Sequence, residues 1–146
     1  WLYVAIVMDL CSRRVISWAF SDKPNSELTV RALRLVAQKR NIKGKVIFHS
    51  DQGCQYTSQS FQKALVEHGI ESSMSRAGNC LDNAVTERFF RSLKSERVNY
   101  RRYLTRHQAM ADIIDYIEPF YNQKRKHDKL GNISPVQYEQ KLLKSA

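Results

Sequence analysis

The stretch KVIFHSDQG, residues 45–53, places a carboxylate at the end of a short apolar run. Its letters VIF, residues 46–48, are typical of a buried strand. Asp51 follows this run closely, and Gly53 supplies a turn. Because ligand-binding and catalytic groups gather at the carboxyl ends of strands in α/β folds, Asp51 is a candidate functional residue. The competing interpretation is that Asp51 only caps the turn.

Further strands and helices are predicted on both sides of this stretch. Short apolar runs predict strands over residues 2–8, 15–20 and 70–74. Helical periodicity and capping residues predict helices that begin near residues 25–26, 57–58, 82, 106 and 134. The third of these helices is expected to end near Val98 and the fourth near Tyr121. The order β-β-α-β-α-β-α-α indicates a mixed α/β fold in one domain, residues 1–146, with residues 122–146 as its C-terminal tail.

The helix expected from Asp82 carries an acid and two bases on one face. Glu87, Arg91 and Lys94 lie at positions i, i+4 and i+7, which a helix brings to the same side. An acid beside two bases fits a metal ligand flanked by phosphate contacts, although a solvated face with helix salt bridges is the more common cause of such a pattern. A separate apolar stripe is expected to face the core and comprises Val85, Phe89, Phe90 and Leu93.

The chain carries a large excess of basic residues. It has 24 Lys and Arg against 14 Asp and Glu, a formal net charge of +10 in 146 residues. Such an excess indicates a polyanionic partner, and nucleic acid is the leading candidate. A protein that is simply basic and soluble is the alternative. The candidate phosphate contacts are Arg88, Arg91, Lys94, Arg97, Arg101, Arg102, Lys124, Arg125 and Lys126.

Cysteine usage and hydropathy argue against several other classes. Cys11, Cys54 and Cys80 are odd in number and contain no CxxC pair, which argues against a disulfide framework and a zinc finger. No apolar run of about 18 residues is present, so no transmembrane segment is expected. A reducing compartment fits this pattern best.

Two motifs and a tail carry a resemblance to a known family. Residues 49–58, HSDQGCQYTS, resemble the second-aspartate motif of retroviral-integrase-like transposases, and residues 75–96 resemble their glutamate motif. Positions 52–86, 35 residues, separate Asp51 from Glu87, which matches the D(35)E spacing of this superfamily. The last similarity is to the tail of bacterial insertion-sequence transposases of the OrfB type, in Tyr121-Asn122, Arg125, His127, Leu130-Gly131 and Ser134-Pro135.

The resemblance implies an RNase-H-like mixed sheet flanked by helices and a DDE-type polynucleotidyl transferase. Asp51 and Glu87 would be catalytic carboxylates that bind Mg²⁺ or Mn²⁺, with two ions in the complete enzyme. Lys94 would contact DNA near the scissile phosphate, and residues 75–81 would form an active-site loop. The family chemistry is hydrolysis of a DNA strand, followed by attack of the freed 3′-hydroxyl on another phosphodiester.

The resemblance also implies partners and a location. The partners would be DNA, as transposon ends and as target, and further copies of the chain in a homo-oligomer. The location would be the bacterial cytoplasm, in association with the nucleoid, without a membrane.

One carboxylate of the family pattern has no counterpart at its usual place. The family's first catalytic aspartate lies on a strand before the segment that begins here at Trp1. We therefore expect the first, central strand and one metal ligand to lie outside this chain, which alone should be inactive and unstable. Asp9 is the alternative first metal ligand, although it also fits a residue that opens a turn.

Two other functions are open on the sequence. A nuclease of the same fold, such as an RNase H or a resolvase, would share the carboxylates but not the spacing and the tail. A non-catalytic remnant would bind DNA without need of Asp51 or Glu87. His49 is expected to pack or hydrogen-bond rather than to bind metal, whereas His127 could reach a phosphate or cap a helix.

Overall fold

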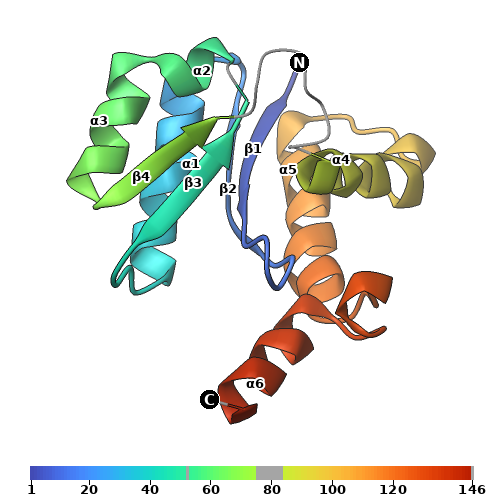
Figure 1. Cartoon of the computed structure of the whole chain (residues 1–146). Helices are drawn as coiled ribbons and strands as arrows, with labels where there is room; N and C mark the ends of the chain where they lie inside the picture. Colours follow the sequence, from blue (N-terminus) through green and yellow to red (C-terminus); the bar gives the residue numbers. More distant parts are fainter. Residues whose placement is uncertain (52, 75–83, 146) are drawn as a thin grey trace. The chain divides into compact units, whose positions relative to one another are not determined.

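The computed structural model describes residues 1–51, 53–74 and 84–145, and its contacts divide the chain into two compact units (Figure 1). Unit 1 comprises Trp1–Val7 and Ile16–Ala84. Unit 2 comprises Met8–Val15 and Val85–Ala146. The predicted loop over residues 75–81 and the predicted helix cap Asp82 lie outside the described residues.

The described residues of unit 1 form most of strands β1 and β2, whose Met8 and Val15 are counted in unit 2, together with strands β3 and β4 and three helices. Strands β1 (Tyr3–Met8) and β2 (Val15–Ser21) form one two-stranded sheet. Strands β3 (Val46–Ser50) and β4 (Ile70–Met74) form a second, parallel sheet, with Val46 opposite Ile70 and Ser50 opposite Met74. The helices are α1 (Ser26–Lys39), α2 (Cys54–Thr57) and α3 (Gln59–Glu67).

Side-chain caps mark the starts of α1 and α3, whereas α2 begins after Gly53 without one. The Asn25 side chain accepts a hydrogen bond from the Leu28 amide at 3.3 Å, and Ser58 Oγ accepts one from the Phe61 amide at 3.2 Å. Each cap satisfies an amide that has no partner within its helix. The predicted starts of α1 and α3 are therefore confirmed.

One core cluster of unit 1 is formed by residues of α1, α3 and β4 (Figure 1). Its buried residues are Val30, Leu33, Phe61, Ala64, Leu65 and Ile70. Phe48 of β3 packs against this cluster, and its ring lies edge-on to Phe61 with centroids 5.3 Å apart. Phe48 thus packs β3 against the core on one face, whereas Ile47 on the other face is 56% exposed. The prediction of a buried strand is wrong in this respect, because only one face of β3 is covered.

Unit 2 is built from helical segments around an aromatic core. Its segments are α4 (Ala84–Glu96, with Ala84 itself counted in unit 1), η2 (Val98–Tyr100), α5 (Arg106–Asp115), η3 (Tyr116–Asn122), η4 (Asp128–Leu130) and α6 (Pro135–Ser145). Phe89 and Tyr121 pack edge to face with centroids 4.9 Å apart. Phe89 of α4 and both Tyr116 and Ile117 of η3 are almost fully buried, so these two segments share one core.

The predicted helix over residues 106–121 is confirmed as a continuous helical run, but its last part is not an α-helix. The α-helix ends at Asp115 and continues as a π-helix, η3, which contains Pro119. Proline has no amide hydrogen and its ring clashes with the carbonyl four residues earlier, so a regular α-helix cannot continue unchanged through this position. A wider π turn accommodates such a residue.

Other differences from the predicted elements are small. Helix α2 was not anticipated, because four residues show no helical periodicity. Helix α4 ends at Glu96 rather than near Val98, where the short 3₁₀-helix η2 follows. The mixed α/β fold and the order of strands and longer helices are confirmed. No helix in the described part of the chain is long and apolar enough to cross a membrane.

Candidate active site and nucleic-acid interface

Asp51 lies directly after β3 in unit 1 and is exposed to solvent. Its Oδ1 accepts a hydrogen bond from the Gly53 amide at 2.7 Å, which holds the carboxylate over the turn. Tyr56, in the helix that follows this turn, packs its ring edge-on against Phe61 with centroids 5.3 Å apart. Burial raises the pKa of Tyr56, and the negative charge of Asp51 raises it further. The exposed Asp51 carboxylate thus follows a strand and precedes a helix whose aromatic side chains, Phe48 and Tyr56, pack against the core.

His49 lies in β3 two residues before Asp51. Its Nδ1 forms a hydrogen bond with Ser73 Oγ at 3.0 Å. Ser73 is the residue of β4 that lies opposite His49 in the sheet. The prediction that His49 packs or hydrogen-bonds is confirmed. Its role is to tie the end of β3 to the end of β4.

Glu87 lies in the first turn of α4, in unit 2, and is exposed. Arg91 and Lys94 are exposed on the same helix, while Phe89 and Leu93 are buried. The two faces that the sequence predicts for this helix are thus both present. Because the apolar face is fixed in the core, the acidic and basic side chains are directed to solvent.

Asp9 lies at the start of the turn between β1 and β2. Its Oδ1 accepts hydrogen bonds from the amides of Cys11 at 2.8 Å and Ser12 at 3.1 Å. Its own amide donates to the Arg14 carbonyl at 2.9 Å. These bonds are those of an aspartate that opens a turn, as the sequence also allows.

The donor set of the chain fits a hard divalent cation. Asp51 and Glu87 offer exposed carboxylate oxygens, the ligand type that Mg²⁺ prefers in proteins. Among the residues with described positions, no group of three or more His, Cys, Asp or Glu side chains lies close enough together to hold a metal ion. Asp51 belongs to unit 1 and Glu87 to unit 2.

Several of the predicted phosphate contacts have acidic partners within unit 2. Arg97 forms ion pairs with Asp112 at 2.8 Å and Asp115 at 2.9 Å, and Arg101 reaches Asp112 at 3.2 Å. Asp112 also accepts a 2.6 Å hydrogen bond from Tyr103. Arg97 is thus committed to a network that ties α4 to α5, which makes it a structural residue.

Arg88 and Arg91, by contrast, line a hollow of about 400 Å³ in unit 2. Arg125 and His127, two residues of the predicted tail motif, line it as well. Arg13 and Lys129 complete its basic wall. Sequence reasoning did not select Arg13 or Lys129, because only the fold brings the β1–β2 turn beside the tail. Lys124 and Lys126 are exposed.

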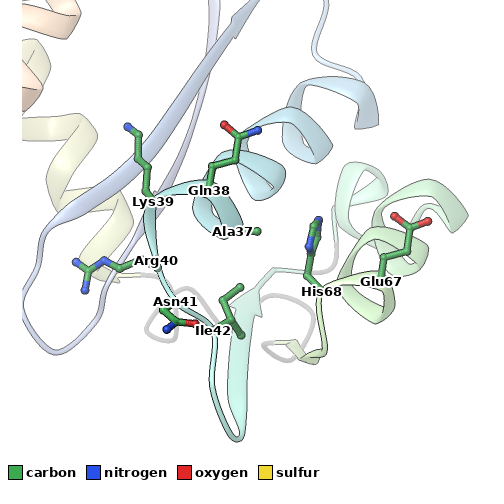
Figure 2. A pocket seen from close by; sticks show the side chains of 8 residues that line it. All are labelled: Ala37, Gln38, Lys39, Arg40, Asn41, Ile42, Glu67 and His68. Atoms are coloured by element: carbon green, nitrogen blue, oxygen red, sulfur yellow. The ribbon is translucent and has the colours of Figure 1, made fainter.

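A second hollow, of about 560 Å³, lies in unit 1 at the end of α1 (Figure 2). It is lined by residues 37–42 together with Glu67 and His68. Its charges are mixed, and the Lys39 ammonium lies 4.0 Å from the centre of the Trp18 ring. None of the predicted site residues contributes to it.

The described residues form a mixed α/β fold with a carboxylate directly after β3. The integrase core domain family matches residues 1–80 with one model and residues 87–143 with a second model of the same description. The chain belongs to the integrase core domain family.

Transposases of bacterial insertion sequences are among its relatives. The chain is 41% identical over 143 residues to transposase InsF of insertion sequence IS3A from Escherichia coli K12, which is 98% of this chain and 50% of the relative. It is 38% identical over 141 residues to a 31 kDa protein of insertion element IS600 from Shigella sonnei. The chain therefore spans about half the length of these relatives.

Solved integrase structures have the same fold. The catalytic core domain of BIV integrase superposes with a TM-score of 0.69 at 18% identity, over 98% of this chain and 90% of that chain. A chain of the simian T-cell lymphotropic virus intasome gives 0.71 at 20% identity, over 94% and 47%. The predicted RNase-H-like class is thereby confirmed.

Proposed function

We propose that this chain supplies catalytic carboxylates of a DDE-type DNA transposase, which cleaves a DNA strand and joins the freed end to target DNA. The observation that carries the proposal is the 41% identity to transposase InsF across 98% of the chain. The exposed position of Asp51 directly after β3, whose Phe48 packs against the core, supports its catalytic role.

Asp51 and Glu87 are the residues that would hold Mg²⁺ or Mn²⁺, two ions in the complete enzyme. The ions would supply Lewis-acid activation and neutralise charge at the phosphate. In the first step water attacks the phosphorus and the 3′-oxygen leaves as a hydroxyl. In the second step that hydroxyl attacks a phosphodiester of the target, and the target's own 3′-oxygen leaves. No protein–DNA bond forms, so the role of this chain is to position the carboxylates and the DNA.

The DNA would be held by basic side chains of unit 2. Arg88, Arg91 and Lys94 extend along α4 from Glu87, and the remaining candidates are Lys124, Arg125 and Lys126. Contacts of this kind bind phosphates and lose affinity steeply with added salt. The partners are transposon ends, target DNA and further copies of the chain.

The test is a cleavage and joining assay on a chimera in which this chain replaces the matched half of InsF. We expect the chimera to nick and join donor-end DNA in Mg²⁺ or Mn²⁺, and to lose both activities when EDTA removes the metal. DNA binding in EDTA should persist, because phosphate contacts by Arg and Lys need no metal. Activity that is unchanged in EDTA would contradict the proposal.

Substrate choice separates the proposal from a nuclease of the same fold. A DNA–RNA hybrid and a branched DNA are offered beside donor-end duplex. Cleavage confined to the hybrid or the branched substrate, without joining, would favour the nuclease. Donor-end joining supports the transposase.

Gly53 provides a finer test of the carboxylate's placement. A Cβ built on Gly53 would lie 2.8 Å from Asp51 Oδ1 and 3.1 Å from Gln55 Oε1. Gly53→Ala should therefore displace the Asp51 carboxylate, while the turn itself accepts alanine because the φ of Gly53 is −59°. We expect strand joining by the chimera to fall on the order of a hundredfold, since a misplacement of about 1 Å has that effect.

Thermal denaturation is the control for Gly53→Ala. The unfolding free energy should change by less than about 1 kcal/mol, because both crowded atoms end flexible side chains. Full joining activity in the alanine variant would show that the placement of Asp51 does not matter to the reaction.

A further inference from the structure

The hollow of about 400 Å³ in unit 2 is lined by an unusual concentration of positive charge. Arg13, Arg88, Arg91, Arg125 and Lys129 line it, against a single carboxylate, that of Asp128. Cavities that bind ligands have volumes of about 300–1,000 Å³, so the hollow can take a group larger than a single ion. One guanidinium group can donate two parallel hydrogen bonds to two oxygens of a phosphate, so a wall of arginines favours a phosphate-bearing ligand.

Arg125 is fixed in this wall before any ligand arrives. Its Nε and Nη2 donate to the Glu96 carboxylate at 3.0 Å and 2.6 Å, and Tyr116 donates to the same carboxylate at 2.6 Å. The hydrogen bond from Arg125 is the main cause that lowers the pKa of Glu96, so the pair stays charged. The guanidinium carbon also lies 5.8 Å from the centre of the Tyr121 ring. The Arg125 side chain is therefore already ordered at the hollow, so ligand binding would cost little of its conformational entropy.

Arg13 occupies its place at a conformational cost. Its φ is +64°, a left-handed conformation in which glycine or asparagine is strained far less than arginine. Backbone strain of this kind persists mainly where the side chain has a task. At this position the Arg13 side chain lines the hollow from the β1–β2 turn.

His127 lines the hollow without adding charge. Its ring lies edge-on to Tyr121 with centroids 4.7 Å apart, and its buried Nε2 has no hydrogen-bond partner among the described residues. Burial lowers the pKa of His127, as do the charges of Arg125 and Arg13, while the Tyr121 carbonyl and Glu96 act in the opposite direction. The positive wall therefore comes from the arginines and Lys129.

We propose that this hollow binds the phosphodiester backbone of DNA without a metal ion, with Arg13, Arg91 and Arg125 as its principal contacts. The choice of DNA among phosphate-bearing ligands rests on the proposed function. The hollow is formed within unit 2 by the β1–β2 turn, α4 and the tail, and neither Asp51 nor Glu87 lines it. Its contacts are to phosphate and are independent of base sequence.

The test measures binding of a fluorescent blunt DNA duplex to the whole chain in EDTA, as a function of salt. The variants are Arg13→Gly and Arg91→Gln, with Arg106→Gln as a charge-matched control, an exposed residue on α5 outside the hollow. Each hollow variant should weaken binding several-fold and reduce the slope of log affinity against log salt by about 0.9, the value for one phosphate contact. The control should leave the slope unchanged.

Arg13→Gly also separates binding from folding. Glycine relieves the left-handed strain, so its melting temperature should equal or exceed that of the unchanged chain while its DNA affinity falls. Wild-type affinity and slope in both Arg13→Gly and Arg91→Gln would overturn the proposal.

The pKa and the NMR signals of the His127 imidazole should change when an anion binds in the hollow. An anion bound beside it raises its pKa, so DNA binding should tighten as the pH falls from 8 to 6, and His127→Gln should remove most of that dependence. In NMR titrations the DNA duplex should shift the His127 ring signals, and inorganic phosphate should shift them only weakly. Saturation by inorganic phosphate with no response to DNA would overturn the DNA assignment in favour of a free anion.

Failure of the hollow to bind DNA and failure of the proposed catalysis give different experimental results. Asp51→Asn and Glu87→Gln should keep full DNA affinity in EDTA. If strand joining fails but the hollow variants still lose DNA affinity, the binding site stands without the catalysis. If joining succeeds and the hollow variants bind normally, the catalysis stands and the hollow has another purpose.

Discussion

Asp51→Asn and Glu87→Gln should each lower strand joining by the InsF chimera by about a thousandfold or more. Each change removes a negative charge and a strong oxygen donor for Mg²⁺, yet keeps the size of the side chain. Metal ions contribute several kcal/mol to phosphoryl transfer, and each 1.36 kcal/mol is a factor of ten in rate, so the loss of one ligand has this order of magnitude. The measurement is a gel assay of nicked and joined DNA under conditions of enzyme excess.

The side chains of Asp51 and Glu87 are exposed, so a change in joining activity can be separated from a change in stability. Exposed isosteric changes alter the unfolding free energy by about 0.5 kcal/mol at most, so the variants should fold as the parent does. Asp9→Asn is the matched control, because Asp9 Oδ1 accepts hydrogen bonds from the amides of Cys11 and Ser12. Asparagine can accept the same bonds, and we expect joining to stay within a few-fold of the parent.

Two outcomes would change the assignment of the carboxylates. Full activity in either Asp51→Asn or Glu87→Gln would remove that residue from the metal site. Loss of activity in Asp9→Asn, with Asp51→Asn unaffected, would place the metal at the β1–β2 turn. Loss of DNA affinity in EDTA in either variant would show that the change acts on binding rather than on chemistry.

The parts of this fold that local patterns dictate could be predicted from the sequence. The apolar letters of residues 46–48 predict β3, and the three-and-four spacing of Phe89 and Leu93 predicts the buried face of α4. Asn25 and Ser58 predict the starts of two helices, because their side chains bond amides only three residues away. The exposed position of Glu87 agrees with the separate apolar stripe that the sequence predicts for this helix.

The parts that depend on distant contacts could not be predicted. The basic hollow combines Arg13 with Arg88 and Lys129, and no local pattern links these positions. Arg97 has the same charge as Arg91, yet Arg97 pairs with Asp112 and Asp115 of α5, whereas Arg91 lines the hollow. The π-helix at Pro119 is a compromise between the proline and the buried rings of Tyr116 and Tyr121, which must both reach the core.

The hydrogen-bond partner of Asn122 is likewise a distant residue that no local pattern indicates. The tail motif marks Asn122 by resemblance alone, whereas in the structure its side chain pairs with the backbone of Val15, 107 positions earlier. The Val15 amide donates to Oδ1 at 2.9 Å, and Nδ2 donates to the Val15 carbonyl at 3.0 Å. Both residues are buried, so the first residue of β2 obtains its hydrogen bonds from the end of η3.

Asn122→Ala should therefore lower the unfolding free energy by about 3 kcal/mol or more. The change leaves a buried N–H and a buried C=O of Val15 without partners, and each such group costs about 1–3 kcal/mol. Urea denaturation followed by circular dichroism measures the effect as a lower midpoint with an unchanged slope. Asn99→Ala, at an exposed asparagine of η2, is the control and should change the free energy by less than about 0.5 kcal/mol.

Asn122→Asp tests which half of the pair matters more. Aspartate keeps the acceptor for the Val15 amide, but it loses the donor to the Val15 carbonyl and adds a charge to a fully buried position. Burial of an unpaired charge costs more than loss of one hydrogen bond, so this variant should be at least as unstable as Asn122→Ala at neutral pH, and it should recover part of the loss as acid protonates the carboxyl. A midpoint for Asn122→Ala equal to that of the parent would show that water replaces the side chain at no cost, and that the link between η3 and β2 is dispensable.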